Sequence, residues 1–227
     1  MARIKAVAFD AYGTLFDVHA PARRALGLLA PERAAAFSDL WRRKQVEYTW
    51  LRSLMGVYEP FDRVTADALD HALDAFALAG EPGLRETLLA SYRRLDAQPD
   101  AEPALRALTA AGLPIAILSN GASATLKEGC AAAGFNGLID RILSVEAVGV
   151  YKPHPSAYRL ALEAFGAAPG EIAFVSANGW DAAGGAQFGL FTLHVNRANA
   201  PAERLEAAPH AVIATLKDAP AVILAAA

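Results

Sequence analysis

The sequence predicts an α/β fold in which a parallel sheet is interrupted after its first strand by a helical insertion. Strand-like and helix-like segments alternate from residue 99 onward, a pattern typical of parallel strands joined by helical crossovers. Residues 21–95, by contrast, show helical spacing of apolar side chains and no strand. Before this insertion, residues 4–9 have the composition of a buried parallel strand.

The first predicted strand ends at a carboxylate, Asp10, and Gly13 then allows a sharp turn away from the sheet. A carboxylate after a buried strand, followed by a glycine turn and the hydroxyl of Thr14, suits covalent catalysis. In such a mechanism Asp10 attacks an electrophilic centre and forms an ester. The alternative is a strand-end aspartate that caps a turn.

Three helices are predicted in the insertion. The first opens at Pro31 and closes at Gly56, because proline favours the first helical position and glycine the position after the last. The second is predicted to begin after Thr65 and the third near Pro82. No strand is expected among them.

The rest of the chain is expected to build the sheet. Strands are predicted at residues 114–118, 142–144, 172–175 and 191–195, and helices at residues 103–111, 121–134, 155–165, from 181 onward and 215–227. Right-handed crossovers place the carboxyl ends of such strands on one edge, where ligands bind in open α/β sheets. We therefore expect one crevice to gather the polar residues near these ends: Asp10, Ser119, Asn120, Ser176, Asn178 and Asp181.

Composition narrows the class of protein. The chain has 227 residues, of which 54% are hydrophobic, and this suits a core domain of residues 1–16 and 99–227 with an inserted domain of residues 17–98. The net charge of −3 and the lack of a basic run argue against nucleic-acid binding. Cys130 is the single cysteine, so neither a disulfide within the chain nor a paired-cysteine zinc site is expected. Without a signal peptide or a membrane-spanning segment, a cytoplasmic protein is expected.

Several short motifs occur in an order that resembles the order of motifs in a known superfamily. They are DAYGT at residues 10–14, WRRKQ at 41–45, EYTW at 47–50, LSNG at 118–121, YKP at 151–153 with Tyr158, and SANGWD at 176–181. In this set and order the chain resembles the haloacid dehalogenase superfamily, and within it the L-2-haloacid dehalogenases, over essentially its whole length. The resemblance implies a Rossmann-like core with a helical cap domain inserted after the first strand, in agreement with the pattern of helices and strands.

The resemblance also implies a reaction. Asp10 would displace halide from C2 of a short (S)-2-haloacid and form an ester with inversion. Water would then attack the ester carbonyl of Asp10 and release an (R)-2-hydroxyacid. The family implies no metal and no cofactor, and its members are commonly homodimers. The halogen is left open, with fluoroacetate included.

Roles of the polar residues follow from the same resemblance. Arg42 is expected to stabilise the leaving halide, with Asn120 as a second donor. Ser119 is expected to bind the substrate carboxylate, although Ser119 could also act as a helix N-cap. Thr14 is expected to hydrogen-bond Asp10 or the incoming water. For Arg42, the alternative is a solvated position on a helix face.

A second set is expected to serve the hydrolysis of the ester. Lys152 would lie near the nucleophile and stabilise its negative charge, and Tyr158 would hold Lys152 or Asp181 in place. Asp181 is the expected acceptor of a proton from water, with Ser176 and Asn178 positioning the same network.

The apolar wall of the pocket is expected from Val46 and Trp180, with core packing as the alternative for each. Backbone N–H groups in the Tyr12 and Asn120 turns are expected to help Ser119 bind the substrate carboxylate. Tyr48, Trp50 and Phe61 are further candidates, and His19 could line the entrance. Val46 stands where relatives often have leucine. Excluding water at this wall would strengthen the electrostatics around the nucleophile.

Two other functions compete with the dehalogenase hypothesis. A magnesium-dependent small-molecule phosphatase of the same superfamily would carry a second aspartate two residues after the nucleophile, where this chain has Tyr12. It would also have an acidic residue shortly before Asp181, where residues 175–178 are VSAN. Magnesium prefers carboxylate among its oxygen ligands, so both departures disfavour this function. A non-catalytic binding protein would have no need of Lys152 and Asp181 together.

Overall fold

A computed structural model describes residues 3–26 and 31–227. The remaining residues, 1–2 and 27–30, fall within the predicted core and insertion and lie outside the described part. Six parallel strands form one sheet in the order β3-β2-β1-β4-β5-β6. The strands are β1 Ala6–Phe9, β2 Ile115–Ser119, β3 Arg141–Ser144, β4 Ile172–Ser176, β5 Phe191–Val195 and β6 Ala211–Ile213. This strand order and the flanking helices confirm the predicted Rossmann-like core.

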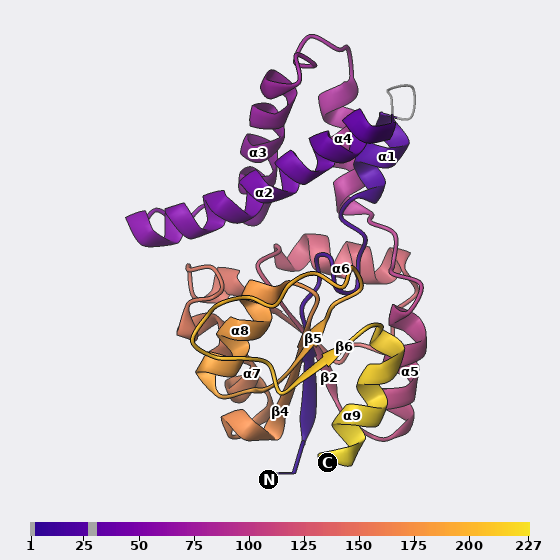
Figure 1. The fold of residues 1–227 in the computed structure, drawn as a ribbon, viewed down its shortest axis with the longest axis vertical. Helices are drawn as coiled ribbons and strands as arrows, with labels where there is room; N and C mark the ends of the chain where they lie inside the picture. Colours follow the sequence, from indigo (N-terminus) through magenta and orange to yellow (C-terminus); the bar gives the residue numbers. More distant parts are fainter. Residues whose placement is uncertain (1–2, 27–30) are drawn as a thin grey trace.

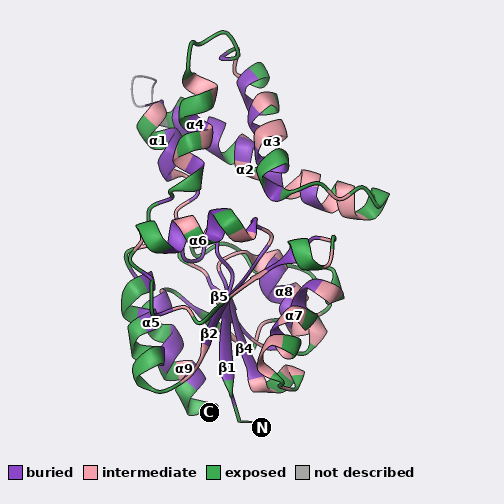
Figure 2. Cartoon of the chain, turned by 180° about the vertical axis from the view of Figure 1, so that it is seen from behind, coloured by how far each residue is buried: buried purple, intermediate pink, exposed green. Residues whose placement is uncertain are grey.

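The centre of the sheet carries the chemistry. β1 pairs with β2 on one side and with β4 on the other, with Phe9 opposite both Ile117 and Val175. All residues of these three strands are buried, as the purple strands in Figure 2 show. The register therefore brings Asp10, Ser119 and Ser176 to the same edge of the sheet.

Helices cover both faces of the sheet (Figure 1). α5 Ala101–Ala110 and α9 Ala219–Ala225 lie on one face, and α7 Pro155–Phe165 and α8 Gly179–Phe188 lie on the other. α6 Ser123–Ala132 lies between the sheet and the insertion.

The described part of the insertion is built of helices joined by loops and lies over the carboxyl ends of the strands (Figure 1). It consists of α1 Ala20–Ala25, α2 Pro31–Met55, α3 Phe61–Ala75 and α4 Leu84–Arg93. α2 ends as predicted, with Gly56 in the left-handed conformation that lets the chain leave a helix. One buried apolar cluster continues from Phe9 of the core to Phe37 and Trp41 of the insertion. We propose, as the sequence predicts, that residues 17–98 form a cap domain.

Two predicted helix starts were wrong, and two short elements, α1 and β6, were not predicted. α3 begins at Phe61, ahead of Thr65, because Pro60 with its extended backbone already ends the preceding loop. β6 was not predicted, since three residues are too short for a periodic signal. The terminal helix α9 begins at Ala219, after a 3-10 turn. No helix in the described ranges combines the length and the apolar character needed to cross a membrane.

Candidate active site

Asp10 lies where β1 ends, beneath helix α2 of the insertion, and is only 6% exposed. Its Oδ2 accepts hydrogen bonds from Thr14 Oγ1 and Asn178 Nδ2, both at 2.8 Å, and from Ser176 Oγ at 3.4 Å. Its Oδ1 lies 3.3 Å from Lys152 Nζ. One carboxylate oxygen is thus held by several neutral donors, while the other faces a cation and has lone pairs left for bonding.

A second buried carboxylate shares the same lysine. Lys152 Nζ donates to Asp181 Oδ2 at 2.9 Å, and Tyr158 Oη donates to Asp181 Oδ1 at 2.8 Å. Ser176 Oγ lies between the two carboxylates, 3.2 Å from Asp181 Oδ2. Lys152 is 1% exposed and Asp181 is 0% exposed, so one ammonium balances two buried negative charges.

Burial shifts the titration of this network. Removal from water raises the pKa of Asp181 to about 6, against the lowering effect of the Lys152 ammonium. Burial, together with the neighbouring Asp181 carboxylate, raises the pKa of Tyr158 well above its ordinary value. Tyr158 therefore stays protonated near neutral pH and acts as a donor, whereas Asp181 can take up a proton.

Arg42 reaches from the insertion into the site. Its Nη2 donates to the Tyr12 carbonyl oxygen at 3.4 Å and to Asn178 Oδ1 at 3.3 Å, and its Nη1 donates to Gln45 Oε1 at 2.7 Å. The guanidinium is therefore held by residues of both the insertion and the core. The alternative of a freely solvated Arg42 is wrong.

Gln45 is a positioning residue to which the sequence analysis assigned no role. It is buried one helical turn after Arg42, where its Nε2 donates to Thr65 Oγ1 at 2.7 Å. Its Oε1 also accepts a hydrogen bond from Tyr92 Oη at 2.9 Å. The sequence did offer a signal for this role, because an amide side chain three residues after Arg42 lies on the same face of a helix and can contact it.

Ser119 and Asn120 follow β2, as predicted. Ser119 is completely buried and its Oγ accepts the backbone N–H of Gly121 at 3.0 Å. The N-cap alternative for Ser119 is wrong, because Ala122 occupies that position of α6. Asn120 Oδ1 accepts the backbone N–H of Lys152 at 3.0 Å, which ties the two loops together.

A small cavity of about 10 Å³ lies over Asp10, the space that about one water molecule needs. Its lining consists of Asp10, Tyr12, Arg42, Val46, Thr49, Phe61, Asn120, Asn178 and Trp180. Of the residues expected at the apolar wall, Val46, Phe61 and Trp180 lie in this lining, together with Tyr12 and Thr49. Ser119, Thr14, Lys152, Tyr158, Ser176 and Asp181 are absent from this lining.

Three residues expected at this wall or its entrance lie elsewhere. Tyr48 packs against His71 of α3, with ring centroids 6.4 Å apart. The Trp50 indole packs edge to face against the Trp180 indole, with ring centroids 5.3 Å apart. His19 lines an adjoining cleft that also touches Arg42 and Asn178.

The arrangement can perform displacement at carbon followed by hydrolysis. It provides a buried carboxylate nucleophile, a fixed guanidinium at the other side of a small cavity, and a second carboxylate able to accept a proton. Within residues 3–26 and 31–227, no group of three or more His, Cys, Asp and Glu side chains is arranged to hold a metal ion.

Comparisons with known proteins agree with this geometry. The model of the haloacid dehalogenase-like hydrolase family matches residues 4–189. The (S)-2-haloacid dehalogenase 1 of Pseudomonas sp. (strain CBS-3) is 40% identical over 224 residues, which cover 97% of each chain. A crystal structure of an L-2-haloacid dehalogenase is 44% identical with a TM-score of 0.93, covering 98% of this chain and 99% of that chain.

A further solved structure is the L-2-haloacid dehalogenase of Xanthobacter autotrophicus with chloropropionic acid covalently bound. It is 38% identical with a TM-score of 0.89, covering 99% of this chain and 100% of that chain. Relatives of this similarity, aligned over nearly the whole chain, share their fold and ancestry with it. The chain therefore belongs to the haloacid dehalogenase-like hydrolases, within the group formed by the (S)-2-haloacid dehalogenases.

Proposed function

We propose that the chain hydrolyses short (S)-2-haloacids to (R)-2-hydroxyacids through an ester at Asp10, without a metal ion. The observation that carries the proposal is the Asp10 carboxylate beneath Arg42 in one small cavity. The relatives named as (S)-2-haloacid dehalogenases, one of them with chloropropionic acid covalently bound, support the same reaction.

In the first half-reaction, an electron pair of Asp10 Oδ1 attacks C2 of the haloacid. The C–O bond forms as the carbon–halogen bond breaks, and the configuration at C2 inverts. Halide departs with the bonding electrons and needs no proton, so no general acid is required. Arg42 and Asn120 stabilise the charge on the halide, and loss of one such donor typically costs about a hundredfold or more in rate.

In the second half-reaction, water attacks the carboxyl carbon of Asp10. Oδ2, now the ester carbonyl oxygen, becomes an oxyanion held by Thr14 Oγ1 and Asn178 Nδ2, which already lie at 2.8 Å. Asp181 accepts the proton of the water. The ester C–O bond then breaks, and the hydroxyacid oxygen takes the proton back from Asp181. The water oxygen stays in the Asp10 carboxyl group, which loses the second proton of the water to solvent as it ionises.

The hydrogen bonds of the Tyr12 carbonyl oxygen support a reaction mechanism without magnesium. The phosphatases that resemble this chain use the backbone at this position to bind the metal, but here the Tyr12 carbonyl oxygen accepts from Asn178 Nδ2 at 3.0 Å and from cationic Arg42. Both site carboxylates are bonded to the Lys152 ammonium, and Ala177 has no side-chain oxygen. A divalent cation would meet two positive charges and few free oxygen ligands.

We extend the proposal to fluoroacetate. The cavity is small, and Arg42 and Asn120 supply donors to a compact halide, which offsets part of the strength of the carbon–fluorine bond. Fluoride release from fluoroacetate, measured with an ion-selective electrode, tests this part alone. If the wild-type protein released fluoride no faster than the Asp10→Asn variant, the extension to fluoroacetate would be wrong.

The decisive experiment is halide release from separate (S)- and (R)-2-chloropropionate in the presence of a chelator. Release from the (S) form alone, with (R)-lactate as product, is expected. A single turnover in H₂¹⁸O should place the label in Asp10 and leave the hydroxyacid unlabelled. No release from either enantiomer, together with magnesium-dependent hydrolysis of a phosphate ester, would replace the proposal by the phosphatase alternative.

We also propose a homodimer, as the family resemblance suggests. Large apolar side chains are exposed around the carboxyl end of α2, and Leu54 is 84% exposed. Their neighbours Leu51, Met55 and Val57 are exposed as well. Burying such a patch against a second copy would remove apolar surface from water. Light scattering should give a mass twice that of the 23.9 kDa chain. In the Leu54→Asp variant the measured mass should fall to that of a single chain.

A further inference from the structure

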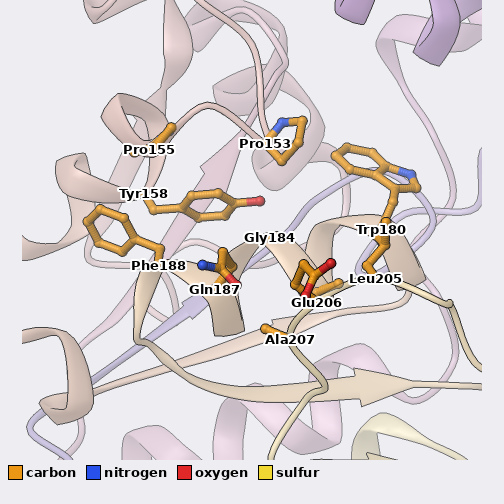
Figure 3. Close-up of a pocket in the computed structure, with 11 residues that line it drawn as sticks. Pro153, Pro155, Tyr158, Trp180, Gly184, Gln187, Phe188, Leu205, Glu206 and Ala207 are labelled. Carbon is orange, nitrogen blue, oxygen red and sulfur yellow. The ribbon is translucent and has the colours of Figure 1, made fainter.

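A larger cavity, of about 470 Å³, lies beside α8 and outside the site just described (Figure 3). Its wall is mainly apolar, with Pro153, Tyr158, Ala183 and Phe188 on one part and Leu205 on the loop opposite. The proposed reaction makes no use of this volume. The cavity nevertheless adjoins the loop that carries Lys152, because Pro153, the next residue in the chain, forms part of its wall.

Trp180 is the side chain that lines both this outer cavity and the small cavity over Asp10. It stands in the first turn of α8, next to Asp181, and its indole packs edge to face against Trp50 with centroids 5.3 Å apart. In Figure 3 the indole stands beside Pro153 at the border of the outer cavity. Trp180 therefore borders both spaces.

We infer that Trp180 sets the upper limit on substrate chain length, and that the outer cavity is a subsite for the alkyl chain of longer 2-haloacids once this ring is removed. The inference rests on the proposed function. The substrate would keep its reacting C2 at Asp10 while its alkyl chain crosses the position of the indole. With Trp180 in place, its ring borders the space over the nucleophile on the side of the outer cavity, so an alkyl chain that extends past the ring is excluded.

The chemistry of the outer cavity defines the tail that it accepts. Apolar side chains dominate its wall, and each methylene buried there should strengthen binding about fourfold. Gln187 and Glu206 are its polar members. A second carboxylate at the end of the tail would meet Glu206, so neutral alkyl tails are expected to bind better than tails with an acidic end.

The test compares (S)-2-bromopropionate, (S)-2-bromohexanoate and (S)-2-bromooctanoate as substrates. Wild type should lose kcat/KM with each added length. In Trp180→Ala, the ratio of kcat/KM for bromohexanoate to that for bromopropionate should rise at least about tenfold. Trp180→Phe, which keeps a ring in the wall, should change the ratio much less. An unchanged ratio in Trp180→Ala would overturn the inference.

Ala207→Phe is the matched control, because it fills the outer cavity from the loop without touching the reacting groups. Alone it should leave turnover of bromopropionate unchanged, and combined with Trp180→Ala it should abolish the gain for longer chains. If the gain survives in the double variant, the chain does not enter the outer cavity and the inference is wrong.

A binding measurement covers the case in which Trp180→Ala cannot turn over any substrate. Calorimetry on Asp10→Asn and on Asp10→Asn with Trp180→Ala should show at least tenfold tighter binding of bromooctanoate in the latter, and equal affinities would overturn the inference. Failure of the proposed function looks different, since wild type would then release no bromide from bromopropionate.

Discussion

Asp181 has no exposed surface, and its two carboxylate oxygens accept hydrogen bonds from Lys152, Tyr158 and Ser176. Burial raises its pKa to about 6. Only the ionised form can accept a proton, so hydrolysis of the ester should be fast above this pH and slow down as the pH falls through about 6. In the proposed mechanism, the charge of this one buried residue should set the acid limit of the reaction.

Tyr158→Phe should move this limit upward. The tyrosine hydroxyl donates to the charged carboxylate, and such a bond favours ionisation, so its loss should raise the pKa of Asp181 by about one unit. The measurement is the rate of ester hydrolysis in single turnovers against pH. Tyr48→Phe, which removes a hydroxyl from a ring packed against His71 of α3, should leave the midpoint unchanged. A downward shift in Tyr158→Phe would contradict the assignment of Asp181 as proton acceptor.

Gln45→Leu should slow the first half-reaction by about tenfold to a hundredfold, because Arg42 loses the acceptor that orients it. It should also lower the free energy of unfolding by about 1–3 kcal/mol, since Tyr92 and Thr65 lose their buried partner. The measurements are burst kinetics of halide release and urea unfolding. Arg43→Gln, at an exposed position of the same helix, should change neither quantity, and an unchanged burst in Gln45→Leu would argue against a positioning role.

At the scale of elements, α7 and α8 come into close contact at Gly184 of α8, which lies against Tyr158 of α7. A Cβ added to Gly184 would press against Tyr158 Oη and would lie 2.8 Å from Pro153 Cβ. Tyr158 is fully buried and hydrogen-bonded to Asp181, so it cannot move aside at low cost. Close contact here lets α8 carry Asp181 to the lysine loop.

Gly184→Ala should therefore lower the free energy of unfolding by about 1–3 kcal/mol, despite the better helix propensity of alanine. It should also slow ester hydrolysis, because Asp181 and Tyr158 are displaced together. Urea unfolding measures the first effect. Gly80→Ala is the control, since nothing lies within 4 Å of the added Cβ, and its effect should stay within about 0.5 kcal/mol. Equal stability of the two variants would contradict the predicted clash.

At the scale of the molecule, the insertion and the core share one buried apolar cluster, which continues from the central strand to Phe37, Trp41 and Leu69. Polar contacts add to it, among them Thr125 with Asp62 at 3.1 Å. The cavity over Asp10 is closed by both parts, so a haloacid can enter only when side chains or helices of the insertion move.

The whole chain should unfold in a single cooperative transition. Calorimetric and van't Hoff enthalpies should agree, because neither part can lose the shared cluster alone. Phe37→Ala, a change within the insertion, should cost about 3–5 kcal/mol and lower the Tm reported by probes in both parts. Two separate transitions, or a shift confined to the insertion, would show that the parts unfold independently.

Prediction from sequence succeeded where the signal is local. The strand before Asp10, the end of α2 at Gly56 and the helix of residues 155–165 follow from periodicity and turn chemistry within a few residues. It failed for β6, whose three residues pair only because β5 lies beside them. It also left Gln45 without a role, since the value of that amide depends on Tyr92 and Thr65, which are distant in the chain.

The sequence by itself determined the parallel sheet, the helical insertion and the order of polar residues at strand ends, because these depend on local composition and on the fixed handedness of crossovers. Only the tertiary structure decided which carboxylate shares Lys152, how Arg42 is held, and that Trp180 stands between two cavities. These features depend on contacts between different elements, among them Lys152 with Asp10 and Arg42 with Asn178, which lie more than a hundred residues apart in the chain. Packing of whole elements, rather than the preference of any segment, sets such contacts.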